Sequence, residues 1–141
     1  MIVRNVMHKD VVTIRPNLSL REASKIMSKF GIGSLVVVED ENLVGIITST
    51  DIIKAIAEGK DVDNTLVSEV MSKDVITVDP DESLEEAVEK MMERNIKRLP
   101  VVEGGKLVGI ITASDIIVVE PKLIEGIANL LSLKLPGYKG G

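Results

Sequence analysis

The chain has 141 residues, a net charge of −5 and a hydrophobic fraction of 45%, which suit one compact domain or two small domains that share a core. It has no Cys, which excludes disulfides, thiolate catalysis and Cys-based zinc sites. With no Trp, one Phe and one Tyr, it lacks the stacking platforms of single-stranded nucleic-acid binders. The negative net charge argues against nucleic acid and anionic membranes as partners. Because no apolar run approaches the roughly 20 residues that span a bilayer and no signal peptide is expected, we predict a soluble, cytoplasmic protein, and the absence of Gln favours a thermophilic source.

The first predicted elements are a short strand and an amphipathic helix. Residues 11–14 are all β-branched and are soon followed by Pro16, which is typical of a short strand. Residues 19–22 read Ser-Leu-Arg-Glu, the pattern of a capping box, so a helix is predicted to begin after Ser19 and can end at Gly31. Its apolar residues recur at helical spacing. They are Leu20, Ala23, Ile26, Met27 and Phe30.

Two apolar runs and a second helix follow. Residues 35–38 and 43–47 are nearly continuous in Val, Ile and Leu, which is typical of strands that are buried on both faces. The polar residues 39–42 predict a tight turn between these strands. The second helix is predicted to begin after Thr48. Residues 1–60 therefore predict one β-α-β-β-α unit.

The same unit returns once along the chain. Residues 6–16 recur as 70–80 and residues 43–48 recur as 107–112, both at an offset of 64 residues, and roughly half of positions 6–53 are identical in the copy. We predict the second unit over residues 61–118, after an acidic linker near residues 59–64. Since one unit alone buries too little surface, we expect an α/β (α+β) fold in which the copies pack sheet against sheet with pseudo-two-fold symmetry and leave two related clefts.

The copies diverge after Ile117, and we assign residues 119–141 to a C-terminal helix and a flexible tail. Pro121 suits the first position of a helix, and Leu and Ile recur at helical spacing as far as Leu133. An apolar stripe of this kind has to be buried. It can pack on its own module, complete a dimer interface or dock a partner, and the sequence leaves these three alternatives open.

Two motifs carry a family resemblance. The sequence Leu-Val-Gly-Ile-Ile-Thr-x-x-Asp-Ile stands at residues 43–52 and again at 107–116, and Lys-Arg-Leu-Pro-Val-Val stands at 97–102. In a duplicated β-α-β-β-α unit, these motifs resemble a tandem pair of CBS (cystathionine-β-synthase) domains, over nearly all of residues 2–118. The resemblance implies a stand-alone regulatory module that requires no cofactor. It implies that the module binds an adenosine-containing ligand (AMP, ADP, ATP or S-adenosylmethionine), forms a homodimer and regulates a partner protein.

The resemblance places the ribose of that ligand at the Asp of each Thr-x-x-Asp motif, with the Thr beside the sugar or phosphate. The residues are Thr48 and Asp51 in the first copy, and Thr112 and Asp115 in the second. A carboxylate can accept hydrogen bonds from both hydroxyls of a ribose, as acidic residues do in dinucleotide-binding folds. The same pattern at a strand-to-helix junction is also close to a capping box, so a purely structural role stays open.

The best phosphate candidates are Lys97 and Arg98, because Arg offers a bidentate geometry to phosphate. The resemblance implies ligands between the repeats, so these two residues could serve the cleft of Asp51. The alternative is a solvated pair at the end of an acidic helix. In the first copy Gly33 and Ser34 stand at these positions and offer only amide and hydroxyl donors, so we expect unequal sites.

The resemblance also implies that the first, short strand of each copy lines the adenine ring of the ligand; we call these residues the adenine wall. For the apolar residues of the wall, core packing is the alternative interpretation. The wall residues are Thr13, Ile14 and Pro16 in the first copy, and Thr77, Val78, Pro80 and Pro100 in the second. Methionines at helical spacing are interpreted as core filler rather than as a binding groove. They are Met7, Met27, Met71, Met91 and Met92.

No catalytic residue and no metal ligand is predicted. The single His, His8, is replaced by Ser72 in the copy, and we find no nucleophile–base pair, phosphate loop or metal cluster. We therefore predict a regulatory binding protein rather than an enzyme. The alternative is a structural or interaction protein with vestigial clefts, which acts through its dimer surface and its Leu-rich C-terminal helix.

Overall fold

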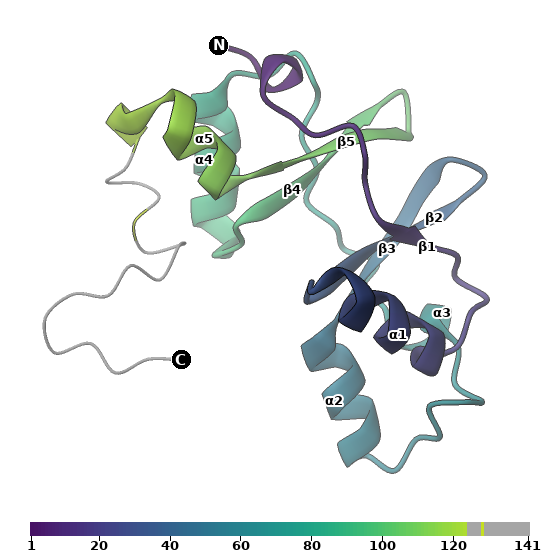
Figure 1. The fold of residues 1–141 in the computed structure, drawn as a ribbon. Helices are drawn as coiled ribbons and strands as arrows, with labels where there is room; N and C mark the ends of the chain where they lie inside the picture. Colours follow the sequence, from purple (N-terminus) through teal and green to yellow (C-terminus); the bar gives the residue numbers. More distant parts are fainter. Residues whose placement is uncertain (124–127, 129–141) are drawn as a thin grey trace, which may run out of the picture. The chain divides into compact units, whose positions relative to one another are not determined.

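The computed structural model describes residues 1–123 and residue 128 (Figure 1). The chain forms two compact units, and neither unit is continuous in sequence. The first-repeat unit contains Asp10–Val75 and Gly104–Leu107, whereas the second-repeat unit contains Met1–Lys9, Ile76–Glu103 and the chain from Val108. None of the helices in the described residues is long and apolar enough to cross a bilayer.

The first-repeat unit contains the predicted β-α-β-β-α series and one additional helix. Its elements are β1 (Thr13–Ile14), α1 (Leu20–Phe30), β2 (Ser34–Glu39), β3 (Asn42–Thr48), α2 (Ser49–Ala57) and α3 (Val67–Val70). β1 lies parallel to β2, and β2 pairs antiparallel with β3. Asp40 and Glu41 form the two-residue turn between β2 and β3, with φ values of 51° and 70°, which suits the right-handed twist of a hairpin.

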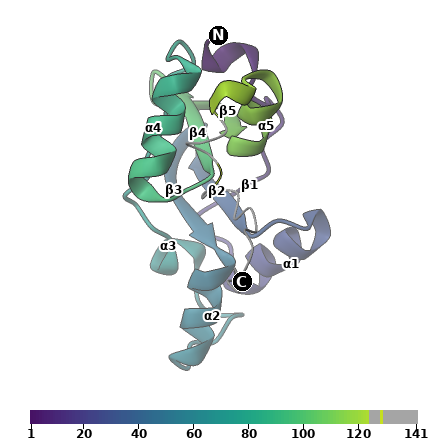
Figure 2. The ribbon, with the colours of Figure 1, turned by 90° about the vertical axis from the view of Figure 1, so that its left-hand side faces the viewer.

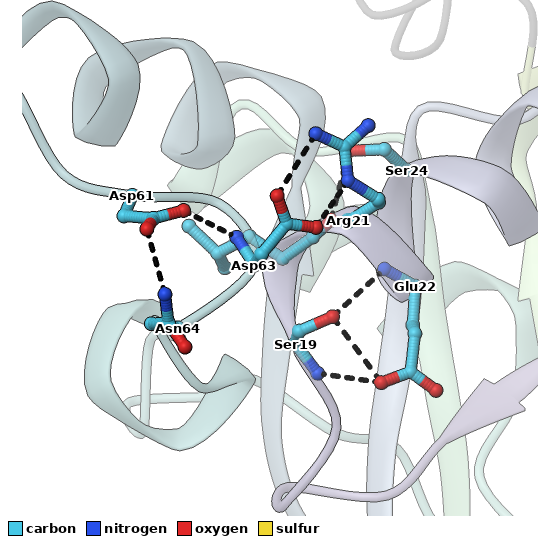
Figure 3. Close-up of polar contacts among 8 residues, drawn as sticks. Ser19, Arg21, Glu22, Ser24, Asp61, Asp63 and Asn64 are labelled. Atoms are coloured by element: carbon cyan, nitrogen blue, oxygen red, sulfur yellow. Dashed lines mark hydrogen bonds and ion pairs between the residues drawn. The ribbon is translucent and has the colours of Figure 1, made fainter.

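The start of α1 is held by the predicted capping box (Figure 3). The Ser19 hydroxyl accepts a hydrogen bond from the Glu22 amide at 3.2 Å, and the Glu22 carboxylate accepts one from the Ser19 amide at 3.2 Å. Arg21 adds an ion pair with Asp63, which ties the helix to the loop before α3 (Figure 3). The helix ends at Gly31, which adopts the left-handed conformation that favours glycine.

The second-repeat unit repeats the helix-strand-strand-helix order of α1, β2, β3 and α2 (Figure 2). Its elements are a 3-10 helix (Val3–Asn5), α4 (Leu84–Arg94), β4 (Arg98–Glu103), β5 (Lys106–Thr112, of which the first two residues group with the other unit), α5 (Ala113–Val119) and a second 3-10 helix (Pro121–Leu123). Of the helix predicted beyond Pro121, only this short 3-10 turn and residue 128 are described. The rest of that prediction, and the predicted tail, lie outside the described residues.

The first strand of the second copy is shorter than the repeat predicts. Only Val78 pairs, in a parallel bridge with Val101, whereas both Thr13 and Ile14 pair in the first copy. Pro100 stands where the first copy has Val36, the partner of Thr13. Because proline has no amide hydrogen to donate to a strand ladder, one pairing position is lost.

Each of the two cores contains one valine that belongs to the other repeat in the sequence. This valine lies in the segment before the first strand of its own repeat. Val3 is fully buried in the second-repeat core, and its amide donates to the Glu82 carbonyl at 2.9 Å. Val67, at the equivalent position, is fully buried in the first-repeat core and donates to the Leu18 carbonyl at 2.8 Å. The N-terminal segments of the two repeats are therefore exchanged between the compact units.

The predicted core methionines are buried or half-buried with one exception. Met27 and Met91 belong to the two cores, and Met7 and Met71 pack against them. Met92 is 51% exposed, so its interpretation as core filler is wrong. Met92 directly follows the buried Met91 on α4, and successive helical residues point in directions about 100° apart.

The exchanged segments approach the sheets so closely that only glycine fits. A Cβ atom on Gly45 would lie 2.8 Å from the Ser72 carbonyl oxygen and 2.7 Å from the Met71 sulfur. A Cβ atom on Gly109 would lie 2.8 Å from both the His8 carbonyl oxygen and the Met7 sulfur. Both glycines belong to the repeated Leu-Val-Gly-Ile-Ile-Thr motif, which explains the glycine of that motif by packing.

We predict that Gly45→Ala lowers the free energy of unfolding by about 1–3 kcal/mol, because a backbone carbonyl has to move to admit the methyl group. Chemical denaturation measures this change. Gly33→Ala is the matched control, since a Cβ there meets only the Ser49 hydroxyl oxygen at 3.5 Å, an ordinary contact. Equal stability of the two variants would contradict the close approach.

Candidate functional site

The first Thr-x-x-Asp motif lies where β3 ends and α2 begins. Thr48 is the N-cap residue, and its hydroxyl accepts a hydrogen bond from the Asp51 amide at 3.1 Å. One oxygen of the half-buried Asp51 carboxylate, Oδ2, accepts from the Thr48 amide at 2.9 Å. Thr48 and Asp51 therefore form a complete capping box. The other carboxylate oxygen accepts no hydrogen bond from the residues that the structure describes.

The second motif has a different hydrogen-bond pattern. The Thr112 hydroxyl accepts from the Asp115 amide at 3.1 Å and donates to Asp115 Oδ2 at 2.6 Å. The same oxygen lies 2.9 Å from Nε2 of His8, which is 60% exposed. Asp115 Oδ2 thus receives two side-chain donors, whereas Asp51 Oδ2 receives a backbone donor.

This pattern changes the acidity of Asp115. Partial burial raises the pKa of the Asp115 carboxyl, but hydrogen bonds from Thr112 and His8, together with the charge of His8, outweigh burial. The pKa of Asp115 is therefore held below its ordinary value of 3.8. The carboxylate is ionised at neutral pH and can act as an acceptor for hydroxyl or amine donors.

A Lys-Arg pair lies beside the second motif, at the positions where the first-repeat unit has Gly33 and Ser34. The Ala113 amide donates to the Lys97 carbonyl at 2.9 Å, which places Lys97 and the following Arg98 beside the start of α5. Both side chains are exposed, and neither forms an ion pair within the described part of the chain. In the first-repeat unit, the Ser49 amide donates in the same way to the carbonyl of the uncharged Gly33. The expectation that Lys97 and Arg98 serve the site of Asp51 stays a prediction.

Ser34 takes the place of Arg98 in the first-repeat unit. It begins β2 and lies opposite Thr48 in the strand register. Its hydroxyl therefore belongs to an element that borders the Thr48–Asp51 capping box. The first-repeat unit combines a carboxylate with a neutral donor, and the second combines a carboxylate with two cations.

The predicted adenine wall of the first copy lines a groove of about 700 Å³. The groove contains Thr13, Ile14 and Pro16, and is bordered by Ile26 of α1 and by the turn that follows β2. Neither Thr48 nor Asp51 lines it. The register explains this separation, because Thr48 faces the first residue of β2 whereas the groove contains the last residues of that strand.

In the second-repeat unit, a lysine lies at the equivalent position. Lys90 occupies the place of Ile26, and its ammonium group donates to the Thr77 carbonyl at 2.9 Å and to the Glu82 carboxylate at 3.0 Å. Val78 and the two prolines of this predicted wall, Pro80 and Pro100, are buried. The two walls thus differ, since Lys90 caps one and an open groove adjoins the other.

The sequence motifs and this arrangement agree with a known family. The CBS domain family matches residues 3–58 and again residues 67–121. The chain belongs to the CBS-domain family. Its two matched segments form a tandem CBS pair, and CBS pairs are regulatory ligand-binding modules.

Relatives of this CBS pair come from archaea and bacteria. The uncharacterized protein MK0525 of Methanopyrus kandleri is 42% identical over 128 residues, a match that covers 89% of this chain and 65% of that protein. The CBS domain-containing protein YhcV of Bacillus subtilis is 38% identical over 117 residues, and the match covers 82% of this chain and 83% of YhcV. The chain therefore spans slightly less than two thirds of the Methanopyrus protein.

A solved structure supplies a chemical comparison for the CBS pair. The CBS domain pair of protein MJ0100, crystallised with 5′-methylthioadenosine and S-adenosyl-L-methionine, superimposes with a TM-score of 0.74 and 37% sequence identity. The superposition covers 86% of this chain and 97% of that chain. Both of the compounds bound to MJ0100 contain adenosine.

One residue of the CBS pair was not expected at the site. His8 contacts Asp115, although the sequence predicts no role for it. The sequence shows that Ser72 stands at the position of His8 in the copy. It does not show the contact, because His8 and Asp115 are 107 positions apart (115 minus 8). Local spacing carries no signal for such a contact.

Among the described residues, no group of three or more His, Asp or Glu side chains is arranged to hold a metal ion.

Asp115→Asn tests the electrostatic account of this carboxylate. Since the folded pKa lies below the unfolded value, the ionised carboxylate stabilises the fold above about pH 4 and this contribution is lost as pH falls through the folded pKa. The stability difference between wild type and Asp115→Asn should be present at about pH 5 and shrink toward pH 3, measured by urea denaturation. A difference that stays constant over this range would contradict the lowered pKa.

Proposed function

We propose that this CBS pair binds an adenosine-containing ligand of the AMP, ADP, ATP or S-adenosylmethionine class and passes its occupancy to a partner protein. The observation that carries the proposal is the half-buried Asp51 carboxylate, which has one oxygen engaged in its own helix cap and one without a donor among the described residues. The ligands bound by MJ0100 support the adenosine class.

A ribose fits the chemistry of this carboxylate. Two vicinal hydroxyls can donate to one ionised carboxylate, whose oxygens together provide about four acceptor positions. The capping bond uses one of these positions at Asp51 and fixes the orientation of the side chain. Capping and ligand binding are therefore compatible roles for the same residue, and Thr48 then lies beside the sugar.

Lys97 and Arg98 support a preference for phosphate at one of the two sites. Both side chains are exposed. Arg98 is the first residue of β4 and Lys97 precedes it, close to the start of α5. Arg can offer two parallel N–H donors to a phosphate, and Lys adds a compact charge. A site that is served by Ser34 instead suits a ligand of lower charge.

The regulatory step is a thermodynamic coupling. A ligand that binds one conformation of the pair more tightly raises the population of that conformation. A partner protein that prefers the same conformation then binds more tightly, and by linkage the partner raises the affinity for the ligand equally. We propose that the chain does this as a cytoplasmic binding protein and not as an enzyme.

Exposed apolar side chains support the proposal that this CBS pair forms a homodimer, and they support an interaction role as the alternative function. In the first-repeat unit, Phe30 of α1 is 52% exposed, and Ile53 and Ile56 of α2 are 65% and 53% exposed. These helices contact one another, so the three side chains offer an apolar surface for a second copy. If the ligand sites are vestigial, this surface is the basis of the alternative function, an interaction protein.

Ligand binding is tested by thermal unfolding with AMP, ADP, ATP, S-adenosylmethionine and a GTP control. A ligand at about 100 times its dissociation constant adds roughly 2.7 kcal/mol to the free energy of unfolding. We expect one adenosine compound to do so, and Asp51→Ala or Asp115→Ala to reduce its affinity about tenfold or more, because a charged acceptor is lost.

Both Asp variants also lose part of a helix cap, at about 1 kcal/mol. Glu22→Ala and Glu86→Ala are the matched controls, since they remove the carboxylates that accompany the α1 and α4 caps and lie outside the proposed sites. Stabilisation by no adenosine compound, or equal ligand affinity in the Asp and Glu variants, would contradict the proposed function.

The phosphate preference has its own test. Lys97→Ala with Arg98→Ala should lower the affinity for ADP about tenfold and leave the affinity for 5′-methylthioadenosine, which has no phosphate, unchanged. Isothermal titration calorimetry measures both affinities. Equal losses for the two ligands would show that these side chains do not recognise phosphate.

A further inference from the structure

His8 is the one described side chain, apart from Thr112, that shares an oxygen of Asp115. Its Nε2 lies 2.9 Å from Asp115 Oδ2, and the imidazole is 60% exposed. The backbone fixes its position, because the His8 amide donates to the Ile110 carbonyl at 2.8 Å and the Ile110 amide donates back at 2.9 Å. His8 is therefore held beside the strand that leads into Thr112 and Asp115.

The first-repeat unit holds Ser72 in the same way. The Ser72 amide donates to the Ile46 carbonyl at 2.8 Å, and the Ile46 amide donates back at 2.9 Å. Ile46 precedes Thr48 and Asp51 by the same spacing with which Ile110 precedes Thr112 and Asp115. The backbone arrangement is thus equivalent, and the difference lies in the side chain at position 8 or 72.

That side chain changes what each carboxylate can accept. Asp115 Oδ2 already accepts from the Thr112 hydroxyl at 2.6 Å and pairs with His8, so a diol that spans both carboxylate oxygens meets an occupied position. At Asp51, Oδ2 accepts one backbone amide, and no side chain shares it among the described residues. A ribose has to displace the imidazole at Asp115 and has no such competitor at Asp51.

We propose that His8 is a specificity-determining residue that competes with the ribose for Asp115 and makes the two sites of this CBS pair unequal. The inference rests on the proposed function, since it deepens the role of the same two carboxylates. His8 then weakens binding of uncharged nucleosides at Asp115, while Ser72 leaves Asp51 open. The competition is modest, because an exposed polar contact of this kind contributes little, and its displacement costs about fivefold in affinity.

The test uses two reciprocal substitutions, His8→Ser and Ser72→His, each of which gives one repeat the side chain of the other. The probe is 5′-methylthioadenosine, which carries the ribose diol without a phosphate that could contact His8. The Asp115 site is identified in a calorimetric titration as the one that Asp115→Ala removes. His8→Ser should raise the affinity of that site about fivefold. If the wild type fills only one site, His8→Ser should instead make the Asp115 site detectable as a second one. Ser72→His should weaken the site that Asp51→Ala removes by a similar factor.

The outcomes separate the two claims. If wild type and both variants bind none of 5′-methylthioadenosine, S-adenosylmethionine, AMP, ADP and ATP, the proposed function fails and the role of His8 fails with it. If the wild type binds and His8→Ser changes neither affinity nor stoichiometry, only the role of His8 is overturned. A ligand-free control uses the single imidazole of the chain, whose NMR resonance should move in Asp115→Asn and stay in place in Asp51→Asn. A resonance unmoved in Asp115→Asn also overturns the proposal.

Discussion

The burial of Val3 and Val67 is the constraint on which the rest of the structure depends. Each valine is fully buried in a core whose other members come from the opposite repeat. A single unit of this size buries too little surface to be stable alone, and the exchanged segments add to both cores. The exchange also accounts for the repeated glycines, because the segment that follows each valine passes over Gly109 or Gly45 at close range.

The same exchange builds the candidate site. The segment after Val3 carries His8 to the end of β5, where Thr112 caps α5 and Asp115 receives the imidazole. The equivalent segment carries Ser72 to β3. Two sites with one backbone plan thus acquire different chemistry through a few side chains. Those side chains are His8 or Ser72, Arg98 or Ser34, and Lys90 or Ile26.

Much of this could be predicted from the sequence, because the deciding signals are local. The Ser19–Glu22 capping box, the helical spacing after it and the two apolar runs predicted the elements that the structure has. The duplicated signature predicted the family. The same local pattern left a capping role for Thr48 and Asp51 open, and the structure shows the complete capping box.

The remaining features depend on contacts between distant residues. Pro100 shortens the first strand of the second copy because it stands where Thr13 has its partner in the first, which becomes visible only with the strand register. Lys90 closes a wall by reaching the Thr77 carbonyl, a contact that the spacing of its helix does not predict. The exchange of Val3 and Val67 and the His8–Asp115 contact are of the same kind.

The central claim is that a ribose diol binds to these carboxylates, and deoxy analogues test it most directly. The affinities of AMP, 2′-deoxy-AMP and 3′-deoxy-AMP should be compared by calorimetry at one salt concentration. The account predicts that loss of either hydroxyl weakens binding by about tenfold or more, since each donates to a charged acceptor. Equal affinities for the three compounds would contradict it and leave Asp51 and Asp115 as helix caps alone.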